Sequence, residues 1–208
     1  MGWTIGKRSR ERRLVQREEF RNVRRVVSED VTAFGEQLAE LHFETLAPEL
    51  TEEMRDRYQR ALDLYERASV ALQQADTATA ARAVEPVLNE GRFSLACVLA
   101  CRDGNDLPQR QDPCFFNSQH GPAATDVVWA PRGGVERLIA VCGTDARRLE
   151  LGEAPDIRLV LVGDRYVKWY EADQQRGLLV AARAGAPKYV MLQADISAMG
   201  SHIRGGGL

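Results

Sequence analysis

The sequence has no long apolar run. No stretch reaches the roughly 18 apolar residues that a membrane-spanning helix needs. Charge follows directly after Gly6, where a secretory signal would continue with an apolar stretch of about 7–15 residues. We therefore expect a cytoplasmic protein, either free or peripheral at the inner face of the membrane.

Cysteine is scarce, with four in 208 residues. In the cytoplasm these are expected as free thiols or metal ligands, and a Cys114–Cys142 disulfide is the alternative for an exported domain.

The sequence also lacks a glycine-rich phosphate loop. Such a loop joins a strand to the helix that follows it, and Gly133-Gly134 does not stand between a strand and a helix. Since no other arrangement is typical of catalysis, the sequence favours a protein that is not an enzyme.

The charge of the chain is unevenly distributed. The net charge is −2, yet from Lys7 to Arg25 nine basic residues stand against three glutamates. On a helix, spacings of three and four residues would align the arginines of this arm into one positive stripe. Its members are Arg10, Arg13, Arg17, Arg21, Arg24 and Arg25.

Such a stripe fits a protein partner, an anionic membrane surface or nucleic-acid phosphate. Nucleic acid is the least favoured, because Trp3 and Phe20 are the arm's only aromatic residues and base stacking needs more. The alternative of a merely solvated helix is weakened, because like charges four residues apart repel. Trp3 and Ile5 ahead of the arginines suit a membrane interface.

The first half of the chain has the apolar period of helices. Residues 8–47 contain no proline, and apolar residues recur every three or four positions: Val31, Phe34, Leu38 and Leu41. Pro48 ends this run, and Thr51 is suited to cap a second helix. A heptad-like stripe follows, made of Met54, Tyr58, Ala61, Tyr65, Ala68 and Leu72. An antiparallel hairpin in a bundle is favoured over an intermolecular coiled coil, because fewer than three heptads are present.

A third helix is predicted over residues 78–89, with a break at Glu90-Gly91 and a buried continuation over residues 92–102. Residues 104–113, rich in Gly, Pro and Asp, form a connection. After it the apolar runs become short and β-branched or aromatic, at residues 115–116, 126–129, 135–141, 157–162 and 166–170. Gly133-Gly134 fits a hairpin turn, and residues 144–150 a short helix closed by Gly152.

The expected fold is therefore α+β, a long-helix hairpin or bundle followed by a small antiparallel β module. The basic helical arm is assigned to residues 1–28, the helical bundle to 29–103, the connection to 104–113, and the β module to 114–172. A partly disordered tail takes residues 173–208, which end in three glycines before Leu208.

Cys114 and His120 lie in one short segment, and Cys142 stands three residues before Asp145. Thiolate, imidazole and carboxylate are zinc ligands, and structural sites are commonly built from two short ligand pairs. Either Asp145 or Cys97 supplies the fourth position. The alternative is a metal-free module, in which Thr144 or Asp145 caps the following helix and the cysteines are inert.

Several segments carry a resemblance to a known group of proteins. They are Glu29-Asp-Val-Thr-Ala-Phe-Gly35, Tyr58-Gln-Arg-Ala-Leu-Asp-Leu-Tyr-Glu-Arg-Ala68, Glu90-Gly-Arg-Phe-Ser-Leu-Ala-Cys97, Pro113-Cys-Phe-Phe-Asn-Ser-Gln-His-Gly-Pro122, Trp129-Ala-Pro-Arg-Gly-Gly134 and the stretch from Val141-Cys142 to Asp145. Together they resemble an uncharacterised actinobacterial family that joins a helical hairpin to a cysteine-containing β module. The resemblance implies an architecture, and several relatives look membrane-associated. It brings no known substrate or catalytic residue.

These features predict a non-enzymatic adaptor, with a basic arm for a protein partner or an anionic surface and a β module that zinc stabilises. The alternatives are a zinc-dependent hydrolase and a nucleic-acid-associated protein. The hydrolase would use zinc with an open coordination position, or Cys114 and His120 as nucleophile and base.

Overall fold

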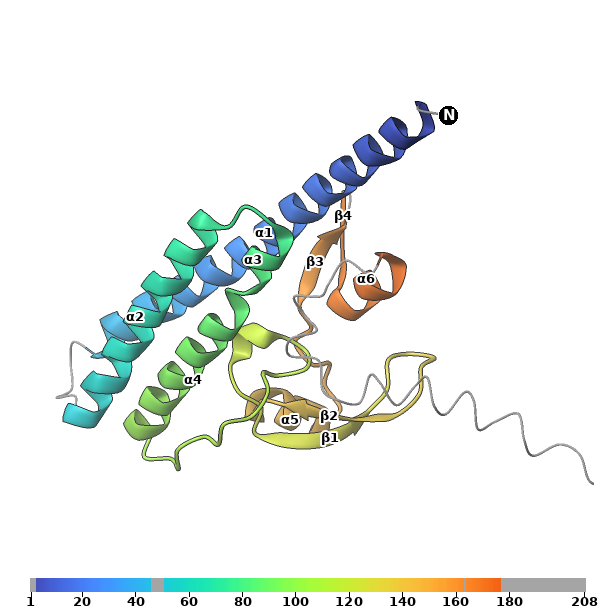
Figure 1. Cartoon of the computed structure of the whole chain (residues 1–208). Coiled ribbons are helices and arrows are strands. Elements are labelled where there is room, and N and C mark those ends of the chain that lie inside the picture. The colour runs from blue at the N-terminus through green and yellow to red at the C-terminus, as the bar shows by residue number, and fades with distance from the viewer. Residues whose placement is uncertain (1–2, 46–50, 163, 177–208) are drawn as a thin grey trace, which may run out of the picture.

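The computed structural model describes residues 3–45, 51–162 and 164–176 and has the predicted α+β architecture (Figure 1). Helix α1 spans Trp3–Thr45, α2 Glu52–Gln74, the short α3 Ala78–Arg82 and α4 Glu85–Arg102. The second half contains the 3-10 turn η1 (Ser118–His120), strands β1 (Thr125–Trp129) and β2 (Arg137–Val141), helix α5 (Gly143–Glu150), strands β3 (Leu159–Val162) and β4 (Arg165–Lys168), and helix α6 (Trp169–Arg176).

The helical bundle has one core to which α1, α2 and α4 all contribute. The stripe predicted on α1 is buried, and the heptad-like stripe of α2 turns Met54, Ala61, Ala68 and Leu72 inward. Tyr58 reaches back to α1, where its hydroxyl donates to the Leu38 carbonyl at 3.2 Å. Thr51 caps α2 as predicted, because its side chain accepts from the Met54 amide. The predicted helix end at Pro48 lies outside the described residues, and so does the predicted tail from residue 177 onward, whereas its first residues, 173–176, belong to α6.

The basic arm is continuous with the bundle. Helix α1 passes through residue 28 without interruption, and Val23, Val26 and Val27 are already buried. Residues 10–18 are exposed at every position, and this end of α1 extends past the other helices (Figure 1). Among the described residues, no helix is both long and apolar enough to cross a bilayer.

The predicted helix break at Glu90-Gly91 is wrong. The helix is interrupted instead at residues 83–84, and α4 then begins with Pro86 in its first turn. A proline is tolerated there because the amides of the first turn have no hydrogen-bond partner within the helix. Gly91 lies inside α4 against the Phe34 ring, so its lack of a side chain allows α4 to pack closely on α1.

We expect Gly91→Ala to destabilise the protein by about 1–3 kcal/mol, despite the higher helix propensity of alanine. A Cβ at this position would lie 2.6 Å from a ring carbon of Phe34, and that ring is fully buried. Denaturant unfolding measures the effect. In Gly143→Ala, the matched control, the new Cβ meets nothing within 4 Å, so the free energy of unfolding should change by less than about 0.5 kcal/mol.

The β module consists of two separate antiparallel hairpins. Strand β1 pairs with β2, with Val128 opposite Leu138, and β3 pairs with β4, with Leu161 opposite Tyr166. The strand predicted at residues 115–116 does not form, and the last predicted strand ends at Lys168, since Trp169 begins α6. The short helix predicted before Gly152 is α5, and Gly152 has the left-handed φ of +73°.

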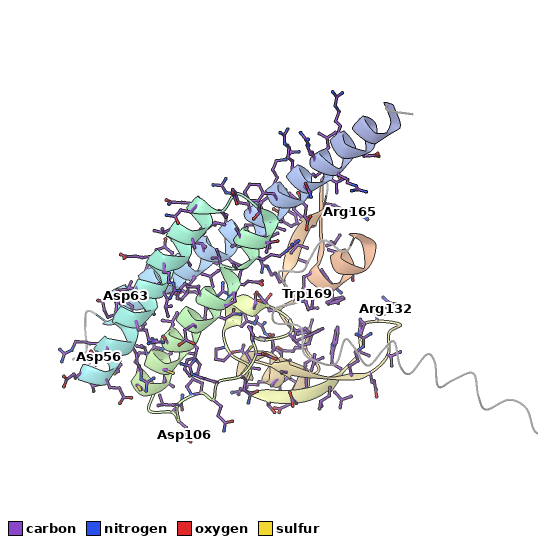
Figure 2. All side chains as sticks on the ribbon, viewed as in Figure 1. Asp56, Asp63, Asp106, Arg132, Arg165 and Trp169 are labelled. Carbon is purple, nitrogen blue, oxygen red and sulfur yellow. The ribbon has the colours of Figure 1, made fainter. Side chains whose placement is uncertain are left out.

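An aromatic cluster joins the two hairpins. The Phe115 ring lies 5.1 Å from Trp169, and the Phe116 ring lies 5.0 Å from Trp129, both in edge-to-face contact. Figure 2 shows Trp169 between the hairpins. Since only a few other side chains are buried in this module, these rings form much of its core.

The connection over residues 104–113 has no helix or strand but is fixed to the bundle. The Arg110 guanidinium binds the Glu90 carboxylate, with one N–O distance of 2.9 Å, and it lies 4.3 Å from the centre of the Phe93 ring. The segment therefore follows α4 back toward the β module.

Candidate metal centre

Two turns of the β module bring the ligand side chains together. The first is closed by a bridge between Pro113 and Pro122 and by the Cys114 amide, which donates to the Gly121 carbonyl at 3.0 Å. Gly121 has a φ of +86°, which favours glycine, and it ends the η1 turn that carries His120. The second turn leads from β2 into α5 and carries Cys142 and Asp145.

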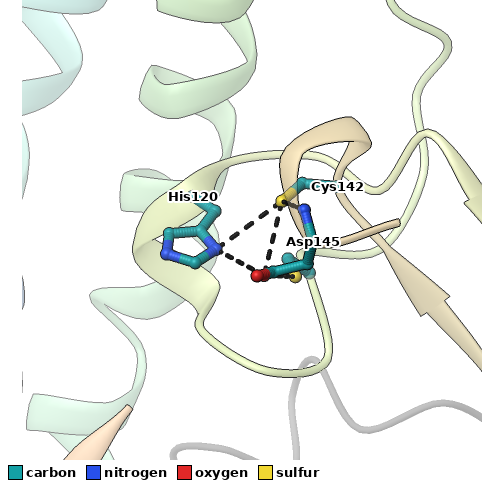
Figure 3. A group of neighbouring side chains, drawn as sticks. His120, Cys142 and Asp145 are labelled. Atoms are coloured by element: carbon teal, nitrogen blue, oxygen red, sulfur yellow. Dashed lines mark hydrogen bonds and ion pairs between the residues drawn. The ribbon is translucent and has the colours of Figure 1, made fainter. Parts of the chain in front are cut away.

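The predicted ligands Cys114, His120, Cys142 and Asp145 converge, with their donor atoms all within 4.8 Å of one another. Figure 3 shows the side chains of His120, Cys142 and Asp145 pointing toward one another. Asp145 Oδ2 lies 2.9 Å from His120 Nδ1, 3.4 Å from Cys114 Sγ and 3.5 Å from Cys142 Sγ. Cys142 Sγ lies 3.6 Å from His120 Nδ1. This group can hold a metal ion.

Cys97, the alternative fourth ligand, is not part of the group, because it is buried in α4 within the helical bundle. Nor do Thr144 or Asp145 cap α5. Cys142 is the capping residue, and its sulfur accepts from the Asp145 amide at 3.5 Å. An amide of a helix N-terminus that points at sulfur stabilises the thiolate form, which is the form that binds metal.

A second layer of contacts orients the ligands. Asp156 Oδ2 lies 3.1 Å from His120 Nε2, so a proton on Nε2 leaves the Nδ1 lone pair directed into the group. Asp145 uses its other oxygen, Oδ1, to accept from the Asp156 amide at 2.9 Å and from Arg148 at 3.4 Å. These partners leave Oδ2 available as the donor atom. The sequence reasoning missed Asp156, and only its acidic type pointed to such a role.

Hydrogen bonds, burial and neighbouring charges shift the pKa values of the four side chains in this group. The Cys142 thiol lowers the pKa of Cys114 to about 5 through a hydrogen bond, although burial opposes the thiolate, and the same pairing raises the pKa of Cys142. Burial disfavours the His120 imidazolium, but the Cys114 thiolate and the Asp145 carboxylate outweigh it and raise its pKa to about 9. Burial also opposes the Asp145 carboxylate, yet the Asp156 amide and the Cys114 thiol lower its pKa. A bound cation would therefore displace protons from His120 and Cys142.

The turn that carries His120 and the segment after Asp156 are attached to the helical bundle through Asp30 of α1, which is buried. Next to His120, the side-chain Nε2 of Gln119 donates to Asp30 Oδ1 at 2.9 Å. Two residues after Asp156, Arg158 pairs with Asp30 Oδ2 at 2.9 Å. The buried Arg92 of α4 lies 3.6 Å from Asp30 Oδ1. The turn that carries His120 and the segment that follows Asp156 therefore meet one carboxylate of the bundle.

The predicted arginine stripe is divided by the fold. Side chains 10, 13, 17, 21 and 24 are exposed, whereas Arg25 is partly buried and donates to the Leu161 carbonyl of β3 at 2.9 Å. Arg25 thus holds the second hairpin against α1. The exposed members, Arg10, Arg13, Arg17, Arg21 and Arg24, form the arginine stripe of the folded protein.

Comparison with protein families, with curated proteins and with solved structures found no match for this chain.

Proposed function

We propose that this protein is a non-enzymatic interaction protein, in which zinc stabilises the β module and the arginine stripe binds a negatively charged partner. The observation that carries the proposal is the exposed end of α1. Residues 10–18 are exposed at every position. The arginine stripe begins in this segment and continues along one side of the helix to Arg24. A helix end with repeated like charge is intrinsically unfavourable, and an anionic partner relieves that repulsion.

Zinc is the metal that the donor set supports best. Two thiolates, one imidazole and one carboxylate suit zinc better than calcium or magnesium, which prefer oxygen ligands. Donor atoms around a tetrahedral zinc ion lie about 3.3–3.8 Å apart. The distances of 3.4, 3.5 and 3.6 Å around Asp145 and Cys142 fall in that range. The 2.9 Å contact must expand, and the separations of up to 4.8 Å within the group must contract, when the ion binds.

A structural site is better supported than a hydrolytic one. Four protein donors complete a tetrahedron, whereas catalytic zinc keeps one position open for water or substrate. Cys114 and Cys142 are also buried, which argues against a thiol nucleophile that a substrate must reach. Nucleic-acid binding is less supported, because Phe20, the aromatic residue of the arm whose side chain is described, packs on the bundle core.

The proposed function is tested with Arg10, Arg13, Arg17 and Arg21 changed together to glutamine. Binding to two anionic probes, phosphatidylserine-containing vesicles and poly-glutamate, is measured at low and at physiological salt. We expect the wild-type protein to bind at least one probe in a salt-sensitive way. At about 1 kcal/mol per arginine near an anionic surface, the variant should lose about 10³-fold in affinity.

The matched control removes the same charge elsewhere, with Arg55, Arg67, Arg132 and Arg147 changed to glutamine. All four are exposed and lie outside the arm. This control should keep binding within a few-fold of wild type. Equal losses in both variants would reveal a general effect of net charge and contradict a specific role for the arm.

A further inference from the structure

The β3–β4 hairpin lies beside α1, next to a line of three arginines on that helix. Arg17, Arg21 and Arg25 are spaced four residues apart, so they follow one another along the same side of the helix. Arg25, the last of them, donates to the Leu161 carbonyl of β3. The hairpin is therefore about one helical turn beyond Arg21, and Figure 1 shows β3 and β4 beside α1.

One face of this hairpin is apolar and basic and is exposed. Leu159 pairs with Lys168 and Leu161 with Tyr166, and alternation along the strands places these four residues on one face. Tyr166 is 66% exposed and Leu159 is 53% exposed. The opposite face carries Val160, which is buried with Ala172 of α6. The hairpin thus has its own small core and leaves a large aromatic and an aliphatic side chain in solvent.

The exposed end of α1 also carries both arginines and exposed apolar side chains. Leu14 is 58% exposed and lies beside the arginine stripe, whereas the exposed Val15 lies on the other side of the helix. Arginine next to aliphatic and aromatic side chains is the combination that enters the interface of an anionic bilayer, where the cations meet headgroups and the apolar groups enter the acyl boundary.

We propose that the arginine stripe and the Leu159–Tyr166 face of the β3–β4 hairpin form one surface that binds an anionic phospholipid bilayer. This inference rests on the proposed function and names the partner of the same arm. The hairpin contributes apolar contact more than charge, because Glu171 lies 3.9 Å from the Lys168 ammonium and offsets it. The helix supplies attraction at a distance, and the hairpin supplies short-range insertion.

The test compares binding of the full chain to vesicles of phosphatidylcholine alone and with phosphatidylserine. We expect Leu159→Ala with Tyr166→Ala to weaken binding to the anionic vesicles about tenfold, since two exposed apolar groups no longer enter the interface. The matched control is Val128→Ala with Leu138→Ala, which removes an exposed cross-strand pair from the other hairpin. It should change the affinity by less than about twofold.

The outcomes separate this inference from the proposed function. Unchanged vesicle binding in the Leu159/Tyr166 variant, with binding lost in the four-arginine variant, would overturn the hairpin's role and leave the arm in place. Binding to poly-glutamate but not to anionic vesicles would overturn the bilayer as partner and support an acidic protein instead. Absence of binding to both probes by the wild type would overturn both proposals.

Circular dichroism of the hairpin variant keeps the comparison interpretable. Both side chains are largely exposed, so the helical signal and the unfolding midpoint should match wild type. If they do not, Tyr166→Ser alone replaces the double variant, because it keeps Leu159 and the β pairing. An affinity unchanged by Tyr166→Ser would count against the inference.

Discussion

Removing zinc from the loaded protein is expected to unfold the β module while the helical bundle persists. The donors of the metal group come from two turns, and the buried core around them is small: Cys114, Phe116, Ile139, Val141, Cys142 and Ala146. Two of these six residues are themselves ligands. A core of this size contributes little stability without a metal, whereas structural zinc contributes on the order of 10 kcal/mol in small domains.

Tryptophan fluorescence provides the measurement, because Trp129 and Trp169 both lie in the aromatic cluster of this module. In a Trp3→Phe background, chelation should shift the emission to longer wavelength, whereas far-ultraviolet circular dichroism should retain most of the helical signal. Re-addition of zinc should restore the emission. Zinc-free protein with unchanged emission and full protection of both cysteines would contradict a structural site.

Ligand substitutions locate the site. Cys142→Ser should abolish the one zinc expected per chain, whereas Cys101→Ser on α4 should keep it, because Cys101 lies outside the metal group. Asp156→Asn should retain zinc with about 10–100-fold weaker affinity, as found for residues that orient a metal-binding histidine. Elemental analysis and competition with a chelator measure both.

The sequence predicted the members of the metal group because their spacing is local. Cys114 and His120 share one turn, and Cys142 and Asp145 share another, so only the meeting of the two turns depended on the fold. The choice between Asp145 and Cys97 could not be made, because it depends on where the bundle stands relative to the module. That position is set by long-range contacts, which leave no periodic signal.

The role of Asp30 could have been predicted in part. It stands four residues after Val26 and four before Phe34, both of which are buried, so its place in the helical period pointed inward. An acidic residue on a buried helix face needs a cationic partner. Its partners, Arg92 and Arg158, lie 62 and 128 residues further along the chain, and neither distance follows from local pattern.

The basic arm shows the same limit. Spacing predicted a positive helix face, but the structure assigns Arg25 to the contact with Leu161. Where the exposed part of α1 ends depends on which segments of the second half pack on it. The sequence of residues 159–168 predicted two short strands. No pattern in it predicted that these strands would pack beside α1.

Asp30 of α1 joins the bundle to two segments of the β module. Its two oxygens accept from Gln119 and Arg158, while its own backbone carbonyl accepts from Arg92 at 3.2 Å. Burial lowers the pKa of Arg92, and the Asp30 carboxylate opposes that shift by favouring the charged guanidinium. Removal of this carboxylate leaves Arg92 buried without its compensating charge, and Arg158 loses its ion-pair partner.

Asp30→Ala should therefore destabilise the protein by about 3–5 kcal/mol, the usual cost of removing one partner from a buried ion pair. The isosteric Asp30→Asn should also destabilise it, because an amide keeps the shape but not the charge that two arginines require. Asp56→Asn on the exposed face of α2 is the control and should stay within about 0.5 kcal/mol of wild type (Figure 2). Chemical denaturation of the zinc-loaded proteins measures the three values.

The Asp30 variants should still bind one zinc per chain, because Asp30 is not a ligand. Unfolding at a lower denaturant concentration with zinc retained would therefore separate attachment to the bundle from metal binding. Wild-type stability in Asp30→Ala would show that the Arg92 and Arg158 contacts contribute nothing to the fold.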